Sequence, residues 1–283
     1  MPNSTFTSSF CLFIFGIAVS AQPQAPVAAQ GGGPPSEQEQ QRMVEAMRDY
    51  ADTYINKLPN FVCEQVTMQF EAGKNGKHWH KNDTLTSKLV YASGREERTL
   101  QLVNNKQVRY RTARPRVPFS SEGEFGILLN KIFDPASDAK FSWAGWENLR
   151  GTPVAKFDFA IDRAHSTLTL INFIKATVPY HGSVYADPQS GSVLKVISTT
   201  TETPPELQMT SVSTTVDYDH VRIGDQSYLL PVSADVLLVT DKDQVRNELH
   251  FEGYRKFEAE STISFGEESG EPAKPVDKAP KIQ

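Results

Sequence analysis

Between residues 36 and 58 apolar side chains recur at every third or fourth position. Ser36 and Glu39 form a capping-box pattern that predicts the start of a helix, and Pro59 predicts its end. Residues at this spacing lie on one face of a helix. The face consists of Met43, Met47, Tyr50, Tyr54 and Leu58. We expect the rest of the domain to supply an apolar surface for this face, because an amphipathic helix buries its stripe.

After Pro59 the apolar pattern changes to a period of two, which is typical of a half-buried strand. The side predicted to be buried carries Val62, Val66, Met68 and Phe70. The side predicted to meet water carries Cys63, Gln65, Thr67 and Gln69. Asn75-Gly76 then predicts a type I′ hairpin turn. The returning strand should run through Leu85, Ser87, Leu89 and Tyr91.

The same alternation recurs in two later segments, which predicts further half-buried strands. Phe157, Phe159 and Ile161 alternate with Lys156 and Asp158, and Val245, Leu249 and Phe251 alternate with Arg246, Glu248 and His250. Turn patterns occur at Asn104-Asn105, at 187–191, at Gly224-Asp225 and at 241–243. One further short helix is predicted at 124–133, with Phe125, Leu128, Leu129 and Ile132 on a face. The expected fold is mainly β (α+β), an antiparallel meander.

The two ends of the chain differ in composition from its middle. Residues 1–21 have an apolar stretch and a small-residue exit at Ala21, which predict a cleaved secretory signal peptide. Residues 22–35 are predicted to be a disordered linker, and residues 266–283 a disordered tail. A single β-rich domain is expected at 36–265. After cleavage Cys63 is the only cysteine, so the fold must rest on its core.

Charge and apolar runs narrow the possible partners. The formal net charge is −5 over 283 residues, and no strongly basic domain stands out. We therefore predict that the protein does not bind nucleic acid. No second apolar run approaches the roughly 20 residues of a membrane span. We therefore expect an exported protein, in the periplasm or outside the cell, without a transmembrane span in its mature form. Peripheral attachment to the envelope stays open.

Candidate catalytic and metal-binding motifs are few. His78-Trp79-His80 offers two imidazoles on one side of a strand, but Lys77 and Lys81 flank them and two ligands do not make a site. The sequence has no G-x-S-x-G elbow, no nucleotide-binding loop and no zinc-protease motif. We predict no catalytic residue, no metal and no cofactor, and hence not an enzyme. Cys63 is interpreted as structural.

One cluster of cations stands out in the sequence. It consists of Arg109, Arg111, Arg114 and Arg116. Guanidinium groups bind anionic head groups, but charged residues also protect an edge strand from unwanted pairing. Both interpretations stay open for this cluster.

The order of helix, meander, short helix and meander resembles the lipoprotein-carrier fold of LolA and LolB. Three segments also look similar to uncharacterised exported bacterial proteins: 58–64 (LPNFVCE), 228–232 (YLLPV) and 254–257 (YRKF). The resemblance covers residues 36–265. It implies a curved antiparallel meander or incompletely closed β-barrel, covered by the N-terminal helix and one short interior helix. It also implies a lipid or a lipoprotein acyl chain as partner, but assigns no functional residue.

The sequence therefore favours an envelope protein that binds or carries an apolar or lipidic ligand in the hollow of a half-barrel. Candidate ligand-binding residues are Arg109, Arg111, Met43, Met47, Tyr50 and Tyr54. One alternative is a structural or interaction protein without a ligand, and another is a hydrolase whose site is assembled from distant residues. The interior of the sheet distinguishes them, since an open apolar hollow favours the carrier, a filled core the structural protein and converging polar groups the hydrolase.

Overall fold

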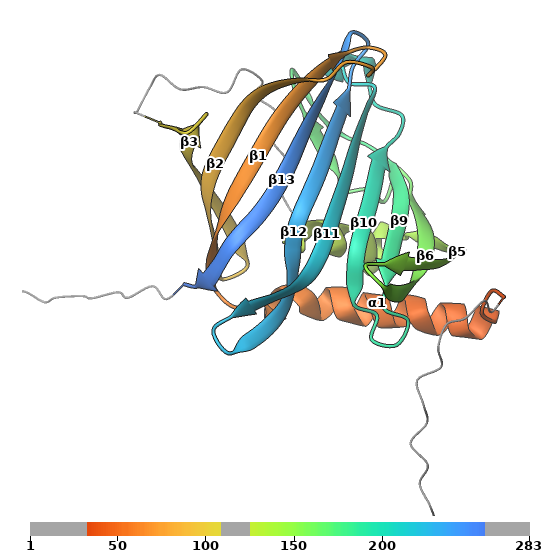
Figure 1. Cartoon of the computed structure of the whole chain (residues 1–283). Coiled ribbons are helices and arrows are strands. Elements are labelled where there is room, and N and C mark those ends of the chain that lie inside the picture. The colour runs from red at the N-terminus through yellow and green to blue at the C-terminus, as the bar shows by residue number, and fades with distance from the viewer. Residues whose placement is uncertain (1–32, 109–124, 258–283) are drawn as a thin grey trace, which may run out of the picture. The chain divides into compact units, whose positions relative to one another are not determined.

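A computed structural model describes residues 33–108 and 125–257, and those from Pro34 onward belong to one compact unit. The signal peptide, most of the linker, the tail and the arginine cluster lie outside these residues. The elements are, in order (Figure 1), α1 (Glu37–Lys57), β1 (Phe61–Gly73), β2 (His80–Ala92), β3 (Arg95–Val103), β4 (Lys106–Gln107), α2 (Ile127–Phe133), η1 (Pro135–Ser137), β5 (Lys140–Leu149), β6 (Thr152–Ile161), β7 (Thr169–Ile171), β8 (Lys175–Thr177), β9 (Tyr180–Ala186), β10 (Val193–Thr200), η2 (Pro205–Leu207), β11 (Ser211–Ile223), β12 (Gln226–Val239) and β13 (Asp243–Lys256).

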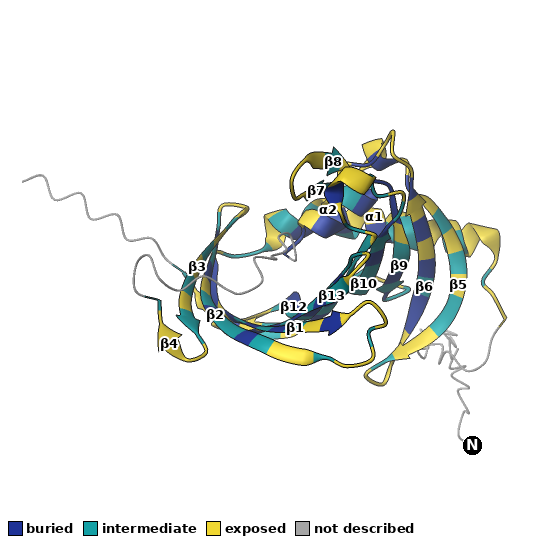
Figure 2. Ribbon diagram, turned by 90° about the horizontal axis from the view of Figure 1, so that it is seen from above, coloured by how far each residue is buried: buried dark blue, intermediate teal, exposed yellow. Residues whose placement is uncertain are grey.

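Eleven of these strands form one antiparallel sheet in the order β4-β3-β2-β1-β13-β12-β11-β10-β9-β6-β5. The first and last long strands, β1 and β13, pair along their length, so the two ends of the domain meet in the middle of the sheet. Figure 2 shows the strands as an open arc with α1 and α2 on its concave side. The sheet is unclosed, with β4 and β5 as its edges. The predicted incomplete barrel with two covering helices is confirmed.

Helix α1 lies across the concave side of the sheet (Figure 2). The predicted capping box is present, with the Ser36 side chain accepting from the backbone of Glu39 and the Glu39 carboxylate accepting from that of Ser36. Near its middle, the backbone of Ala46 lies so close to the β9–β10 turn that a Cβ on Gly191 would be 2.3 Å from it. Near its end, the Tyr54 hydroxyl donates to the carbonyl of Leu229 in β12 at 2.9 Å. The helix thus connects distant strands across the sheet.

Helix α2 is shorter than predicted, beginning at Ile127. Its buried face carries Leu128, Leu129, Ile132 and Phe133. Phe125 precedes the helix, yet it is buried and its ring lies 5.4 Å from that of Phe61 and 5.1 Å from that of Phe251. The apolar face predicted for this segment is therefore in the core, although one of its members is not helical.

The prediction for the two sides of β1 is wrong. Its buried side carries Phe61, Cys63, Gln65, Thr67 and Gln69. On the side predicted to be buried, Val62 is buried, but Val66, Met68 and Phe70 are only half-buried. The reason lies at the start of the strand, where Phe61 is fully buried and stacks on Tyr91 at 5.0 Å. Because side chains alternate along a strand, this one contact directs every second residue from Cys63 to Gln69 inward.

The hairpin after β1 forms, but its predicted turn type is wrong. Gly76 has a positive φ of 62°, whereas Asn75 does not have one, and the loop runs from Gly73 to His80. A type I′ turn needs positive φ at both central residues. That condition is met instead at Asn104 and Asn105, with φ of 51° and 62°, between β3 and β4.

The other strand predictions are confirmed. β6 buries Phe157, Phe159 and Ile161, and β13 buries Val245, Leu249 and Phe251. The predicted turns at 187–191, at Gly224-Asp225 and at 241–243 connect neighbouring antiparallel strands. Within the described ranges, no helix combines the length and the apolar character that crossing a membrane requires.

Candidate functional site

The four candidate residues of α1 lie on one face of the helix and pack onto the core of the concave side. Met47 is fully buried and Tyr54 is 4% exposed. Met43 and Tyr50 are half-buried at the margin of the same core. The rings of Tyr50 and Tyr54 are 5.5 Å apart, and that of Tyr54 meets Tyr218 edge-on at 6.2 Å. The predicted stripe is therefore brought together, with two members inside and two at the edge.

The hydroxyl of Tyr50 differs from that of Tyr54. Tyr54 donates to a backbone carbonyl, whereas the buried Tyr50 oxygen has no hydrogen-bond partner among the described residues. Burial raises the pKa of Tyr50, so the group is a neutral donor at ordinary pH. Leaving a buried hydroxyl unpaired costs about 1–3 kcal/mol. Tyr50 thus carries a hydrogen-bond donor that no described residue pairs.

On the concave face, strands β3, β1 and β13 carry a group of inward polar side chains, which we call the polar section. It consists of Gln65, Thr67, Gln69, Arg98 and Asn247. Gln69 is fully buried and its Nε2 donates to Oδ1 of Asn247 at 3.1 Å. The Nε of Arg98 donates to Oε1 of Gln65 at 2.9 Å. Hydrogen bonding of this kind is what makes buried polar groups tolerable.

Continuing around the arc, the concave face becomes apolar. This apolar section consists of Val184, Val196, Val216, Ala234 and Val236, all buried. These residues occupy directly paired positions on β9 to β12, as in Val184 with Val196 and Val216 with Ala234. On β13, Leu249 pairs with Ala234 and Asn247 pairs with Val236, so the apolar and polar sections meet at this strand. The concave lining is therefore divided into two parts of opposite character.

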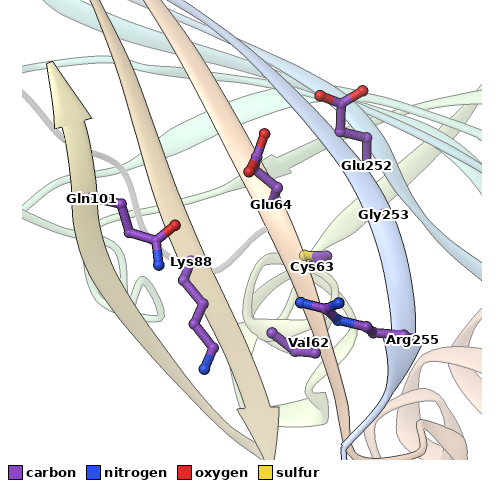
Figure 3. A pocket seen from close by; sticks show the side chains of 8 residues that line it. All are labelled: Val62, Cys63, Glu64, Lys88, Gln101, Glu252, Gly253 and Arg255. Atoms are coloured by element: carbon purple, nitrogen blue, oxygen red, sulfur yellow. The ribbon is translucent and has the colours of Figure 1, made fainter. Parts of the chain in front are cut away.

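The outer face of the sheet carries a shallow pocket of about 430 Å³ (Figure 3). It is lined by Val62, Cys63, Glu64, Lys88, Gln101, Glu252, Gly253 and Arg255. Glu64 lies directly opposite Glu252 on β13 and Lys88 on β2. All three of these charged side chains are exposed, and in the described part of the chain no ion pair joins them. A solvated pocket of mixed charge gives little affinity for any one ligand.

A second pocket, of about 490 Å³, lies between α1 and the α2–η1 segment. Asp49 and Asp52 face Asn130 and Asp134 across it, while Arg48 places its guanidinium over the ring of Phe141 at 5.8 Å. The described residues contain no group of three or more His, Cys, Asp or Glu side chains arranged to hold a metal ion. His78 and His80 are both exposed.

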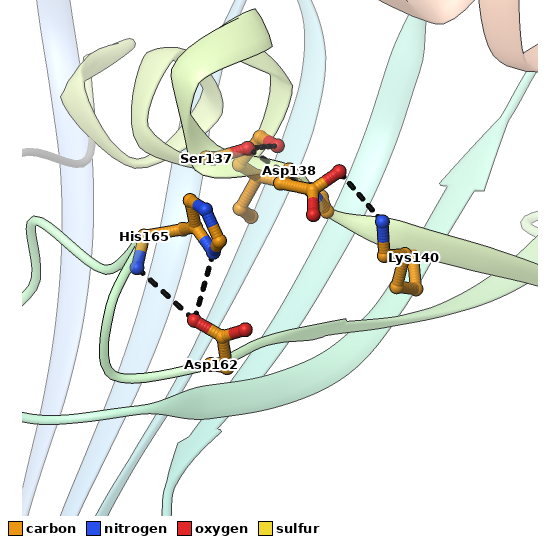
Figure 4. Close-up of polar contacts among 7 residues, drawn as sticks. Ser137, Asp138, Lys140, Asp162 and His165 are labelled. Carbon is orange, nitrogen blue, oxygen red and sulfur yellow. Dashed lines mark hydrogen bonds and ion pairs between the residues drawn. The ribbon is translucent and has the colours of Figure 1, made fainter.

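A serine, a histidine and aspartates occur together near η1 (Figure 4), which bears on the hydrolase alternative. His165 Nδ1 lies 2.9 Å from Asp162, a hydrogen bond that holds the pKa of that carboxyl below its ordinary value. Ser137 is buried and its hydroxyl donates to the carbonyl of Ile132 at 2.9 Å. The Asp138 carboxylate binds Lys140. A serine engaged in this way is a helix-end cap, since a nucleophile must direct its proton to a base.

Cys63 lies on the buried side of β1 beside Tyr254. Burial raises the pKa of the thiol to about 12. The thiolate is the reactive form, so this cysteine is inert at neutral pH, in line with its interpretation as structural.

Sequence reasoning missed the polar section. The polarity of Gln65, Thr67 and Gln69 predicts a side that faces water, because polar residues are mostly exposed. The apolar residues on the other side of β1 made that choice natural. The sequence does contain one indication of the buried side. Phe61 is an even number of residues before Gln65, Thr67 and Gln69, so it lies on the same side of the strand as they do. Arg109 and Arg111 lie outside the described residues, so their role stays a prediction.

Three of the solved structures that this chain resembles are as follows. One is a DUF1329 family protein from Desulfovibrio piger, with 9% identity, coverage of 75% of this chain and 92% of that chain, and a TM-score of 0.36. Another is a LolA superfamily protein from Nitrosomonas europaea, with 9% identity, coverage of 76% and 94%, and a TM-score of 0.34. The third is a putative outer membrane lipoprotein-sorting protein domain from Vibrio parahaemolyticus, with 13% identity, coverage of 76% and 92%, and a TM-score of 0.38.

No protein-family model matches the sequence, and no curated protein matches it. At the TM-scores found, the likeness to the three structures extends no ligand, location or activity to this chain.

Proposed function

We propose that this protein binds one amphipathic, lipid-like molecule against the concave face of its sheet, beside α1. The observation that carries the proposal is the division of the concave lining into a polar and an apolar section. A fatty acid or acyl chain has the same division, with a polar end and a long apolar body. An apolar site with a few placed polar groups is the common design of small-molecule sites.

Helix α1 supplies the side of the site that lies opposite the sheet. Met43 and Tyr50 lie at the margin of the core, and the Tyr50 hydroxyl is a donor with no partner among the described residues. Methionine adapts its shape to irregular apolar partners, which suits a flexible chain. The polar end of the ligand would accept from Tyr50, while its body would lie along the apolar section. Met47 and Tyr54 would hold the helix in place.

The protein would carry out this role in the cell envelope after export. The support is the predicted signal peptide at residues 1–21. No catalytic step is part of the proposal, because Ser137 and Ser166, the serines nearest to His165 and Asp162, each donate their hydroxyl proton to a backbone carbonyl.

A second candidate is a structural or interaction protein without a ligand. It is favoured by the complete burial of Met47 and by the hydrogen bond from Tyr54 to Leu229, which together describe a filled core under the middle of α1. In that case the polar section is only an internal hydrogen-bond network, and α1 covers the concave face without leaving room for a ligand.

Native mass spectrometry of the full chain purified from an envelope fraction distinguishes the two candidates. The carrier should show one bound lipid-like mass per chain and saturable binding of a fluorescent fatty acid. Tyr50→Phe should weaken that binding by about twofold to tenfold, the range of one hydrogen bond. Glu64→Gln on the outer face is the matched control and should have no effect. Absence of both the bound mass and saturable binding would favour the structural candidate.

A further inference from the structure

The β7–β8 hairpin is a two-stranded sheet separate from the main one, and its turn is apolar. Ile171, Phe173 and Ile174 are 68%, 75% and 40% exposed. Single exposed apolar residues are ordinary, but three in four consecutive positions are a concentrated patch. Only one other large apolar residue of the described chain, Ile127 in α2, is comparably exposed, at 41%. We call residues 171–174 the hairpin tip.

The hairpin tip is held rigidly. The Asn172 side chain donates to the carbonyl of Leu207 at 2.9 Å, and the Asn172 backbone donates to that of Ile174 at 3.0 Å. At the base, Ser166 donates to Val178 at 2.6 Å and Arg163 donates to Thr177 at 3.0 Å. A segment fixed in this way loses little entropy when it binds, so its exposed side chains are preorganised for a contact.

The area of the tip argues for a lipid surface as its partner. Scaled by their exposed fractions, the three side chains present roughly 270–460 Å², taking about 150–250 Å² for a fully exposed large side chain. A stable protein interface needs about 800 Å² from each partner, over a broad and complementary surface. Lipid acyl chains need no such match, because the apolar contribution to insertion scales with the apolar area removed from water, whatever its shape.

The charges around the hairpin tip indicate whether the lipid surface that it binds is charged or neutral. Arg163 is paired with Glu202 at 3.5 Å, which leaves the exposed Lys175 on β8 and the exposed Glu206 on η2. These charges cancel, so long-range attraction to an anionic surface is weak. Lys175 follows the tip directly and can extend its ammonium to head groups while its stem stays among apolar atoms.

We propose that the hairpin tip inserts into the apolar layer of a neutral, zwitterionic phospholipid surface and so attaches the protein peripherally. Ile171, Phe173 and Ile174 enter the acyl region, and Lys175 lies at head-group level. This attachment is independent of the ligand proposed for the concave face.

Co-sedimentation of the full chain with phosphatidylcholine vesicles tests the proposal. The wild type should bind, with little dependence on salt. The triple variant Ile171→Ser, Phe173→Ser, Ile174→Ser should bind at least about tenfold more weakly, since each lost apolar side chain removes a large part of the transfer free energy. Phe173→Trp should bind more tightly, because tryptophan prefers the membrane interface. Ile127→Ser is the matched control and should bind like the wild type.

Three results would overturn the proposal: equal vesicle binding by the wild type and the triple variant, binding only to phosphatidylglycerol vesicles with loss at high salt, or self-association of the wild type that the triple variant abolishes. The last result would assign the tip to a second copy of the chain. Fatty-acid binding by the triple variant should match the wild type, which separates a failure here from a failure of the proposed function.

Discussion

The polar and apolar sections of the concave face belong to the same sheet, face the same side and are both buried, yet they are built on different principles. The apolar section is a row of valines and an alanine that follows from hydrophobic alternation. The polar section places Gln65, Thr67 and Gln69 where the same rule would put apolar residues. The two sections therefore differ in cause. The burial of one aromatic residue, Phe61, determines which side of β1 faces the core, although the residues that follow on that side are polar.

The largest expected effect comes from removing that anchor. Phe61→Ala should destabilise the protein by about 3–5 kcal/mol, because the side chain is fully buried among Tyr91, Phe125 and Tyr254. Phe70→Ala is the matched control, with the same substitution on the half-buried side of the same strand, and should cost about 1 kcal/mol. Urea unfolding of both variants measures the difference. The reverse order would mean that the buried side of β1 is the one that carries Phe70.

The next effect concerns Cys63, which follows Phe61 on the inward side. Because burial raises its thiol pKa to about 12, alkylation at mildly alkaline pH should be at least about a hundredfold slower than in the unfolded chain, equivalent to about 2.8 kcal/mol. Mass mapping of the labelled Cys63 peptide measures this rate. Rapid labelling of the native protein would place Cys63 on the solvent side of β1.

The same thiol predicts a direction for stability against pH. Its folded pKa lies above the ordinary value of about 8.5, so the native state keeps a proton that the unfolded chain releases. This contribution is fully present below about pH 8.5 and is lost as pH rises toward 12. Cys63→Ala should therefore flatten the alkaline part of the stability profile, and an unchanged slope would contradict the assigned burial.

A smaller effect is expected within the polar section. Gln69→Ala removes the donor to Asn247 and should cost about 1–3 kcal/mol, since the Asn247 oxygen stays buried without that partner. Gln101→Ala, on the exposed side of β3, is the matched control and should lie within about 0.5 kcal/mol of the wild type. A neutral Gln69→Ala in chemical denaturation would indicate that the polar section is hydrated.

The smallest effect lies on the opposite face of the same strands. Glu64 and Glu252 are directly opposite each other and exposed, an arrangement that is unfavourable for like charges. Glu252→Lys should stabilise the protein by about 0.2–1 kcal/mol at low salt, and the gain should shrink as salt is added. A destabilised variant in thermal melts would show that other contacts of Glu252 outweigh this repulsion.

Much of the fold follows from the sequence because local rules decide it. The capping box of α1, the alternation of β6 and β13 and most turns depend on neighbours in sequence. The inward side of β1 depends on a tertiary contact, the stacking of Phe61 on Tyr91. The turn type at Asn75 depends on the length of the loop before β2, which is six residues. Met43, Met47, Tyr50 and Tyr54 could be placed on one face from spacing alone, whereas Asn247 enters the polar section only through pairing between strands distant in sequence.

The central claim, that the divided concave face holds one lipid-like molecule, is tested most directly by photo-crosslinking. A fatty acid carrying a diazirine on its chain is bound to the full-length protein, irradiated and mapped by peptide mass spectrometry. We predict crosslinks to α1 around Met43 and Tyr50 and to the inward residues of β10 to β12, competed by unlabelled fatty acid. Labelling confined to the hairpin tip or the outer face, or labelling that unlabelled fatty acid does not compete, would contradict the claim.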